Sequence, residues 1–348
     1  MNPVRVSLIG CGQVAGTHLA NLKRSERFEI VSVADVAQAS AQKRAKEFEI
    51  PSWTTDYRTI LDDERVEGVF VLTPPSNHAE IAIAAMKAGK HVFCEKPLAR
   101  TSEQCRQIVR ASKETGRVFL LGYPMRHSPD AANLRDIILS GKLGRPVLFR
   151  DIWGLCKGSP SPAIHDADLG GGVVYEHTHW LDYVSSIFGP ATKVYATVSR
   201  FKPDNTTAGD TFTAIIDFAG GDQAVWSESW AAAGFGWEPI CVGRHVRPTL
   251  DVIGKAGSLH FPTADGQKVL SYYDYKKKLD TPTLQWPWET DWAVNVSGYR
   301  SELEHFYDCV RGQTKPLCTA EDGLTAIVLA EAIFQSSRTG NPVLIGNV

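Results

Sequence analysis

Lys96 is the side chain in the first part of the chain whose type and position could do chemistry, since an amine can donate a hydrogen bond or a proton. The apolar run His91–Cys94 reads as a buried strand, and Pro97 lacks an amide hydrogen, so the strand is predicted to stop at Lys96. Ligands of open α/β sheets bind beyond the carboxyl ends of strands, so the ammonium group is predicted to face a bound molecule. Taken alone, a surface lysine at a turn is the simpler interpretation, and the neighbouring motifs decide between the two.

A second set of reactive side chains follows the three glycines at 170–172. The spacing predicts a helix on which Glu176, His179 and Asp182 are three residues apart and share a stripe. Histidine titrates near neutral pH, so His179 could accept a proton while Lys96 donates a hydrogen bond to a developing alkoxide. The alternative interpretation is that these polar side chains only cap the helix or satisfy the core.

A glycine loop at the N-terminus is the element that would place a ligand near Lys96. The strand predicted over Val4–Ile9 runs into Gly10 and Gly12, and an apolar helix face follows directly. Gly10 allows a tight turn, Gly12 lets the backbone approach a pyrophosphate, and the small Ala15 permits close helix–strand packing. Exposed amides at the helix start would hold the pyrophosphate. The loop residues predicted to contact a dinucleotide are Gly10, Gly12, Gln13 and Val14.

Asp35 ends the second predicted strand, which covers residues 29–34. A carboxylate at this position suits the ribose diol of adenosine and repels a ribose phosphate. No arginine occurs in residues 36–39. These residues favour NAD over NADP.

The composition is typical of a globular protein: 348 residues, 43% of them hydrophobic and 22% charged, with a formal net charge of −2. This charge gives no general attraction to nucleic acid, and no apolar run approaches the roughly 20 residues that span a bilayer. The chain enters its first strand without a signal peptide, and the seven cysteines are scattered without a Cys-x-x-Cys pair. We therefore expect a cytoplasmic protein with reduced thiols.

Strands alternate with helices up to about residue 122, and from about residue 145 longer strands follow one another with fewer helices. The first pattern predicts a doubly wound parallel sheet, and the second an α+β domain with a large, mostly antiparallel sheet. Caps are predicted at Asn77 and Thr101, and a hairpin turn at Gly220–Gly221. The predicted division is a dinucleotide-binding domain over residues 1–122 and a substrate-binding and oligomerisation domain over residues 123–348.

The motifs together resemble the glucose-fructose oxidoreductase and inositol dehydrogenase family of NAD(P)-dependent sugar enzymes, nearly from end to end. The likeness is carried by the glycine loop, the Glu-Lys-Pro turn, the glycines at 170–172 and two further segments, 73–78 and 319–323. The resemblance implies an open-faced sheet in the second domain that forms a homodimer or homotetramer. It also implies a catalytic lysine at Lys96, a *cis* proline after it, and a proton-accepting histidine at His179.

Further site residues follow from the same resemblance and from their positions. The segments at 73–78 and 95–97 imply cofactor contacts from Thr73, Pro74, Asn77, His78, Glu95 and Lys96. The predicted sugar or cyclitol contacts are Lys96, Tyr123, Arg126, Trp153, His165, Glu176 and His179. A salt bridge on the surface is an equally good interpretation of Arg126. In the inositol dehydrogenase branch an acid lies four residues before the histidine, whereas Glu176 lies three before it, so the branch stays open.

The predicted activity is hydride transfer between NAD and a hydroxyl-bearing carbon of a sugar, a sugar derivative or a cyclitol. Two alternatives share the fold: a glycosidase or dehydratase that recycles its NAD, and a dinucleotide-binding sensor without chemistry. A third would use the acids and histidines between His165 and His179 as metal ligands, but their spacing matches no established metal motif, so no metal is predicted. The sugar, the oxidised carbon and the physiological direction do not follow from the sequence.

Overall fold

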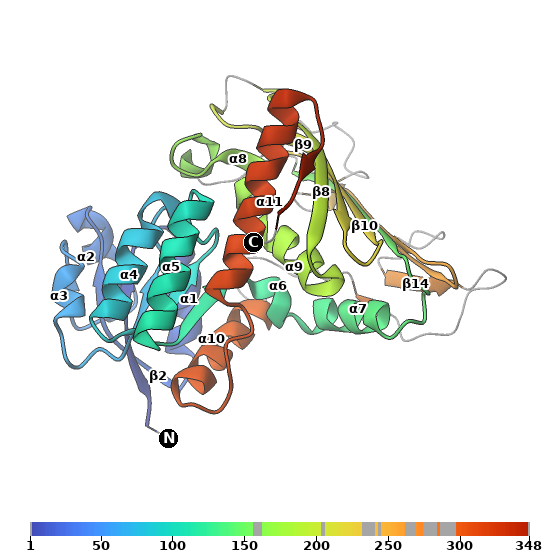
Figure 1. Cartoon of the computed structure of the whole chain (residues 1–348). Coiled ribbons are helices and arrows are strands. Elements are labelled where there is room, and N and C mark those ends of the chain that lie inside the picture. The colour runs from blue at the N-terminus through green and yellow to red at the C-terminus, as the bar shows by residue number, and fades with distance from the viewer. Residues whose placement is uncertain are drawn as a thin grey trace. The chain divides into compact units, whose positions relative to one another are not determined.

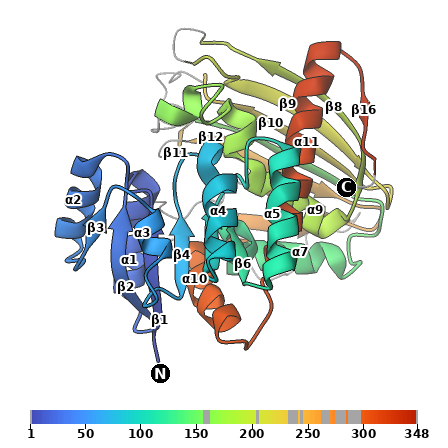
Figure 2. The same cartoon turned by 60° about the vertical axis from the view of Figure 1, so that its left-hand side comes forward.

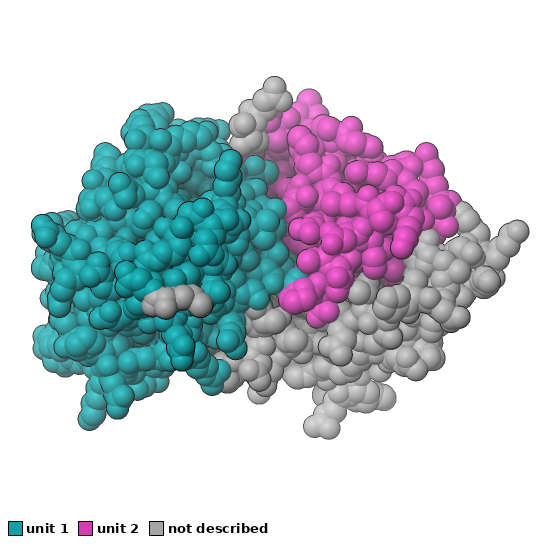
Figure 3. All heavy atoms as spheres, turned by 90° about the horizontal axis from the view of Figure 1, so that it is seen from below, with its two compact units in different colours: residues 1–128, 291–327 teal, residues 129–290, 328–348 magenta. Residues whose placement is uncertain are grey.

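The protein is described here by a computed structural model, in which two compact units are distinguished (Figure 3). Unit 1 consists of Met1–Ser128 and Asp291–Ile327, and unit 2 of Pro129–Thr290 and Val328–Val348. The structure describes residues 2–155, 162–202, 206–231, 241–242, 245–261, 269–273, 284–285 and 297–346.

Unit 1 is built on a parallel six-stranded sheet with the strand order β3-β2-β1-β4-β5-β6. This is the order of a dinucleotide-binding doubly wound sheet, and it places the ends of β1 and β4 at the point where the order reverses. The strands are β1 Val4–Ile9, β2 Phe28–Ala34, β3 Trp53–Thr54, β4 Gly68–Val71, β5 His91–Glu95 and β6 Phe119–Gly122.

Helices cover this sheet, with α4 and α5 lying side by side in both views (Figures 1 and 2). The predicted cap of α5 is confirmed: Thr101 accepts from the amide of Gln104, and the Gln104 side chain accepts from the amide of Thr101. The predicted cap at Asn77 is wrong, because that side chain makes no capping hydrogen bond. The helical segments are α1 Gln13–Lys23, α2 Gln38–Glu47, α3 Arg58–Leu61, η1 Pro75–Asn77, α4 His78–Lys87, α5 Ser102–Thr115, α6 Pro124–His127, α10 Ser297–Val310 and the first part of α11 Ala320–Thr339.

An aromatic cluster joins the late helix α10 to the early strands of unit 1. Phe70 of β4 and Phe93 of β5 are stacked with ring centroids 4.8 Å apart, and Phe306 of α10 meets Phe70 edge-on at 5.5 Å. All three rings are fully buried. Burying an aromatic side chain of this size contributes about 2–3 kcal/mol, so α10 is an integral part of the core of unit 1.

Unit 2 is built on a mixed sheet with the order β15-β14-β13-β12-β7-β10-β9-β8-β16 among the described residues, and β11 pairs with β12. Neighbouring strands are antiparallel except β7 and β10, which are parallel, and Gly221 in the turn before β10 has a φ of 85°. The strands are β7 Leu148–Leu155, β8 Ala191–Ser199, β9 Thr211–Phe218, β10 Gln223–Ser229, β11 Cys241–Val242, β12 His245–Ile253, β13 Ser258–Phe261, β14 Val269–Tyr273, β15 Leu284–Gln285 and β16 Val343–Leu344.

One face of this sheet is covered by helix, while side chains on the other face remain exposed. Trp226 of β10 is fully buried and stacks on Trp180 of α9 with ring centroids 4.4 Å apart. On the same sheet Ile152 and Tyr195 are 43% and 41% exposed. The predicted fold class, a doubly wound parallel sheet followed by an open-faced and mostly antiparallel one, is therefore confirmed. The helical segments of unit 2 are α7 Pro129–Leu139, η2 Pro162–His165, α8 Gly172–Glu176, α9 Thr178–Phe188 and the last part of α11, which lies beside β8 (Figure 1).

Candidate functional site

The glycine loop connects β1 to α1. The fold requires a glycine at position 10, whereas Gly12 has open space beside it. Gly10 has a φ of 102°, and a Cβ on it would lie 2.6 Å from the backbone of Leu72. Gly12 has an ordinary backbone conformation, and a Cβ on it would meet nothing within 4 Å. Gln13 after it is exposed and Val14 is half-buried. The space beside Gly12 fits a pyrophosphate approaching the first amides of α1.

Asp35 lies against this loop at the end of β2. Its carboxylate accepts hydrogen bonds from the amides of Cys11 and Ala37, both at 2.8 Å. Burial and the Asp35 carboxylate raise the pKa of the Cys11 thiol to about 12, so this thiol stays protonated. The structure thus brings together the glycine loop and the carboxylate predicted to bind the ribose diol.

Arg44 is a residue of this region that sequence reasoning missed. It lies on α2, and its guanidinium donates to the carbonyl oxygens of Gly12 at 2.8 Å and Cys11 at 3.4 Å. Arg44 lies beyond residues 36–39, which contain no basic residue, and its side chain reaches back to the loop from the following helix. Arg44 braces the loop and brings positive charge to it.

The segment after β4 lies at the same end of the sheet, because β1 and β4 are parallel neighbours. Thr73 is half-buried, and Pro74 and Asn77 are exposed. The ring of His78 is fully buried, with Nε2 2.7 Å from the carbonyl oxygen of Thr73 and Nδ1 2.8 Å from that of Pro97. His78 therefore contributes by joining two loops, since both of its ring nitrogens already have protein partners.

The Glu-Lys-Pro turn ends β5, and its Lys96–Pro97 peptide bond is *cis*, as the resemblance implied. Glu95 points inward: Oε1 lies 2.7 Å from Nε2 of the buried His18, and Oε2 accepts from the amide of Lys96 at 3.0 Å. Burial raises the pKa of Glu95, but His18 and Lys96 outweigh it, so the pKa of this carboxyl is lowered. Glu95 is thus an inner partner of the turn, and the half-buried Lys96 follows it.

Two predicted sugar contacts in unit 1, Tyr123 and Arg126, have little exposed surface in the structure. Tyr123, which follows β6, is completely buried. Arg126 on α6 forms an ion pair of 2.8 Å with Asp322 of α11, and its side chain is 11% exposed. The alternative interpretation of Arg126, a salt bridge, describes its position, and neither residue gains support as a sugar contact.

The predicted helix after Gly170 is broken, which corrects the stripe of polar residues expected on it. Helix α8 ends at Glu176, and α9 begins at Thr178. Gly172 has a φ of 79°, and a Cβ on it would lie 2.5 Å from the carbonyl oxygen of Gly209, which fixes α8 against the loop before β9. Glu176 and His179 therefore belong to different helices, and three-residue spacing does not place them on one face.

Within α9 the predicted pair of His179 and Asp182 is retained. Both side chains are buried, at 6% and 2% exposure, while Tyr183 donates its hydroxyl to the carbonyl oxygen of Ala131 at 2.7 Å. Tyr183 thus satisfies the core, and His179 and Asp182 remain as polar groups near the start of α9.

His177, at the break between the two helices, has partners that the sequence analysis did not identify. Its Nδ1 lies 2.9 Å from a carboxylate oxygen of Glu228, whose other oxygen accepts from the indole of Trp230 at 2.7 Å. The rings of His177 and His179 are 5.4 Å apart, and the half-buried ring of His165 lies 5.3 Å from Trp230. A regular alternation along β10 would have indicated that Glu228 shares the buried face of Trp226.

Asp151 is a second buried acid of this face, on β7. One oxygen accepts from the indole of Trp180 at 2.8 Å, and burial raises the pKa of Asp151 to about 8. The nearby Glu228 carboxylate adds to this shift. Trp153, a predicted sugar contact, lies two residues further along the same strand, and its side chain falls outside the described part of the structure.

The acids and histidines considered as metal ligands are not gathered by the structure. Among the described residues, one group has three ligand atoms close enough for an ion, and it consists of His18, Glu95 and Glu302. Asp166, in the segment considered earlier, instead accepts from the backbone amides of Asp168 and Leu169.

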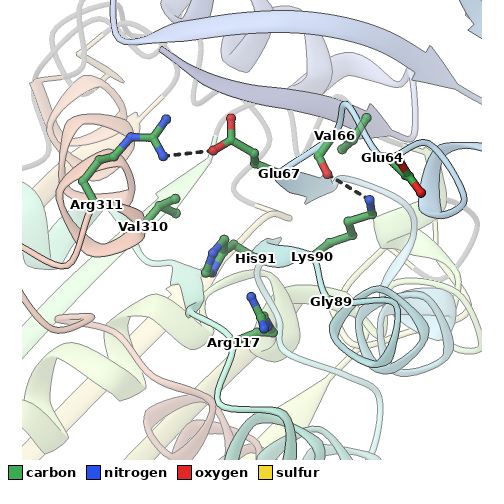
Figure 4. Close-up of a pocket in the computed structure, with 9 residues that line it drawn as sticks. All are labelled: Glu64, Val66, Glu67, Gly89, Lys90, His91, Arg117, Val310 and Arg311. Carbon is green, nitrogen blue, oxygen red and sulfur yellow. Dashed lines mark hydrogen bonds and ion pairs between the residues drawn. The ribbon is translucent and has the colours of Figure 1, made fainter. Parts of the chain in front are cut away.

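A hollow of about 430 Å³ lies at the opposite end of the sheet of unit 1, around the starts of β4 and β5 (Figure 4). Three of its charged side chains have structural partners: Lys90 donates to the carbonyl oxygens of Asp63 and Val66, and Arg311 pairs with Glu67 at 2.9 Å. Ligands of such sheets bind at the carboxyl ends of the strands, so this hollow is not the candidate site. No helix in the described part of the chain is both long and apolar enough to span a membrane.

Known proteins resemble this chain in sequence and in fold over nearly its whole length. Residues 4–123 match the family described as "Oxidoreductase family, NAD-binding Rossmann fold", and residues 135–345 match its C-terminal alpha/beta domain. The chain is 26% identical over 360 residues to an inositol 2-dehydrogenase of Salmonella typhimurium, covering 98% of this chain and 96% of that protein. It is 26% identical over 347 residues to a scyllo-inositol 2-dehydrogenase (NAD(+)) of Bacillus subtilis, with the same two coverages of 98% and 96%.

Among solved structures, a levoglucosan dehydrogenase in complex with NADH and levoglucosan superimposes with a TM-score of 0.83 at 24% identity, covering 99% of this chain and 100% of that one. This likeness supports the fold. The family match confirms the predicted class, an oxidoreductase, and the predicted cofactor, NAD. The chain belongs to the glucose-fructose oxidoreductase and inositol dehydrogenase family of NAD-binding oxidoreductases.

Proposed function

We propose that this protein is an NAD-dependent dehydrogenase that oxidises or forms a hydroxyl-bearing carbon of a sugar, a sugar derivative or a cyclitol. The relatives named above are dehydrogenases of inositols, and a structural neighbour binds levoglucosan. The observation that carries the proposal is the position of Lys96, on the turn that His78 ties to the loop after β4, at the end of the sheet where the glycine loop lies.

The dinucleotide is held by the end of the sheet where β1, β2, β4 and β5 finish. Gly10, Gly12, Gln13 and Val14 receive the pyrophosphate, and Asp35 binds the ribose diol. The loops at Thr73, Pro74 and Asn77 line the same end, while His78 and Glu95 hold those loops from inside. Asp35 disfavours NADP, because its carboxylate would repel a ribose phosphate.

Proton handling is assigned to Lys96 of unit 1 and His179 of unit 2. NAD bound at this end of the sheet would supply a hydride acceptor for the carbinol carbon, and the hydroxyl proton would then have to be accepted by a side chain. His179 accepts that proton, and the Lys96 ammonium donates a hydrogen bond to the developing alkoxide.

The substrate is proposed to lie along the polar and aromatic cluster of unit 2. His165 and Trp230 are in ring contact, and Glu228 fixes the ring of His177 next to His179. Aromatic faces and bidentate acids are suited to the alternating apolar and hydroxyl surface of a sugar ring. Glu176 and Trp153 remain candidates for this set from the sequence.

The proposed division of labour assigns residues 1–122 to the cofactor and residues 123–348 to the substrate and to assembly. Exposed apolar side chains on the open sheet face, among them Ile152, Tyr195 and Ile253, are the surface proposed for a homodimer or homotetramer. Five cysteines of the described residues are buried free thiols, which fits the reducing cytoplasm proposed as the site of action.

A substrate screen tests the proposed class directly. Purified protein is incubated with monosaccharides, cyclitols and glycosides in the presence of NAD or NADP, and absorbance of the reduced cofactor is followed. Net formation of NADH with a monosaccharide or a cyclitol supports the dehydrogenase. Cleavage or dehydration of a substrate without net NADH would contradict the dehydrogenase and support an NAD-recycling enzyme. Binding of NAD without turnover of any substrate would support a sensor.

Variants test the assignment of the proton. Lys96→Ala and His179→Asn are each expected to lower kcat by about 10²–10⁴-fold while the Kd for NAD changes little. Lys87→Ala on the exposed end of α4 and His260→Asn in unit 2 are matched controls that should retain activity. Normal turnover in either the Lys96 or the His179 variant would remove the chemical basis of the proposal.

A further inference from the structure

A buried cluster of two acids and a histidine lies directly behind the Glu-Lys-Pro turn in unit 1. His18 comes from α1, Glu95 from β5 and Glu302 from α10, and one ligand atom of each lies within 4.8 Å of the other two. Glu302 and His18 are 0% exposed and Glu95 is 4% exposed. The cluster is enclosed by aromatic rings, with Phe93 5.1 Å and Tyr299 5.6 Å from the ring of His18.

The two acids of the cluster differ in their hydrogen bonding. Glu95 uses both oxygens, one toward Nε2 of His18 and the other for the amide of Lys96. Neither carboxylate oxygen of Glu302 has a hydrogen-bond partner among the described residues. A buried carboxylate without a partner costs several kcal/mol, whereas the protonated acid avoids that cost and gains an O–H donor.

The charges around Glu302 also favour its protonated form. The titratable groups of the cluster are His18 from α1, Glu95 and Lys96 from the end of β5, and Tyr299 from α10 itself. Burial and the neighbouring Glu95 carboxylate raise the pKa of Glu302 well above its usual range. Nε2 of His18 is already engaged with Glu95 at 2.7 Å, so it is not a partner for Glu302.

We propose that Glu302 is a neutral carboxylic acid beside the Glu95 carboxylate, and that it is a positioning residue for Lys96. Because a neutral Glu302 does not repel Glu95, the Glu95 carboxylate keeps its place between the His18 ring and the Lys96 amide. The first half concerns the protein alone. The second half rests on the proposed catalytic role of Lys96.

A metal ion is the competing occupant, because histidine and two glutamates could bind zinc. Two ligands of one tetrahedral zinc ion lie about 3.4 Å apart, given metal–ligand distances of about 2.1 Å. Nε2 of His18 and Oε1 of Glu95 are 2.7 Å apart, which is the distance of a hydrogen bond with a proton between the atoms. The observed geometry thus favours the proton.

Infrared difference spectroscopy tests the protonated state of Glu302 without reference to activity. Near neutral pH the wild type minus Glu302→Gln spectrum should contain a carboxylic-acid C=O band, distinct from ionised carboxylates. Subtraction is needed because Asp151 contributes a similar band. Glu304→Gln on the same helix, where Glu304 pairs with Arg27, is the matched control and should give no such band. Absence of the band for Glu302, or a stoichiometric cation in wild type that Glu302→Gln loses, would overturn the proposal.

Kinetics of two variants test the positioning role. Glu302→Gln keeps a neutral donor of the same shape, so kcat should stay within about threefold of wild type, whereas Glu302→Ala should lower kcat at least about tenfold with an unchanged Kd for NAD. Equal losses in both variants would show that neutrality is not the relevant property. If Lys96→Ala stays active, the proposed function fails while the infrared result for Glu302 is unaffected, so the two failures are distinguishable.

Discussion

The ring of His78 lies 2.8 Å from the carbonyl oxygen of Pro97, and this contact joins the loop after β4 to the turn after β5. The other ring nitrogen lies 2.7 Å from the carbonyl oxygen of Thr73, which is the second residue after the end of β4. A single buried side chain thereby sets the spacing between two segments proposed to line the cofactor site. Its effect on that site is indirect and can be measured.

His78→Ala is expected to lower the free energy of unfolding by about 2–4 kcal/mol, because a fully buried ring is removed and the carbonyl group to which it donates loses its partner. NAD affinity should fall as well, since the two loops are no longer tied. Denaturant unfolding and NAD titration measure the two effects, and Lys87→Ala on the same helix is the control. Unchanged affinity in a folded His78→Ala protein would contradict the proposed role of these loops.

The two glycines of the loop should respond differently to alanine. In Gly12→Ala the new Cβ meets no protein atom within 4 Å, so stability should change by less than about 0.5 kcal/mol while the Kd for NAD rises at least about tenfold. In Gly10→Ala the Cβ meets the backbone of Leu72 at 2.6 Å, so stability itself should fall by more than about 2 kcal/mol. Thermal unfolding with and without NAD separates the two outcomes, and tight NAD binding by Gly12→Ala would contradict the pyrophosphate assignment.

Asp35→Ser should reduce the preference for NAD over NADP by about tenfold or more, because the repelling carboxylate is removed while the Arg44 guanidinium remains at the loop. The measurement is kcat/KM with each cofactor under one set of conditions. Asp56→Ser, in an exposed turn, is the control. An unchanged ratio would mean that Asp35 does not face the ribose.

Asp151 should make the stability of unit 2 depend on pH. Its folded-state pKa of about 8 is higher than the ordinary 3.8, so its stabilising contribution is complete below about pH 3.8 and is lost as the pH rises toward 8. Asn does not titrate, so the Asp151→Asn variant does not lose stability in this way as the pH rises. Relative to wild type, the variant should gain up to about 1.4 kcal/mol per pH unit between these limits.

Urea unfolding followed by tryptophan fluorescence near pH 5 and pH 7.5 tests this dependence. The exposed Asp136→Asn variant is the matched control and should keep a constant difference from wild type. A difference between Asp151→Asn and wild type that is independent of pH would show that Asp151 is ionised over the whole range.

Much of unit 1 could be predicted because its sequence patterns involve residues that are close together in the chain. Strand β1 was expected over Val4–Ile9 and is found over the same residues, and the cap at Thr101 is also as predicted. Each depends on neighbours in the chain: an apolar run or a capping side chain. The glycine loop and Asp35 came together for the same reason, since they end adjacent parallel strands.

The predictions that needed correction depended on groups distant in sequence. The helix after Gly170 breaks at His177, whose ring meets the Glu228 carboxylate of another element, and a spacing rule for one helix does not include that partner. Arg126 is paired with Asp322, nearly 200 positions further along the chain. Polar side chains of this kind take whichever partner the tertiary structure supplies.

The sequence by itself therefore determined the alternation of strands and helices, the dinucleotide loop and the turn that carries Lys96, because these depend on residues close together along the chain. Tertiary structure alone decided which buried polar groups meet: Arg44 with the glycine loop, Glu302 with Glu95, and Glu228 with His177. The physical reason is burial. A charged or hydrogen-bonding group removed from water must find a partner in the folded protein, and that partner is chosen by packing in three dimensions.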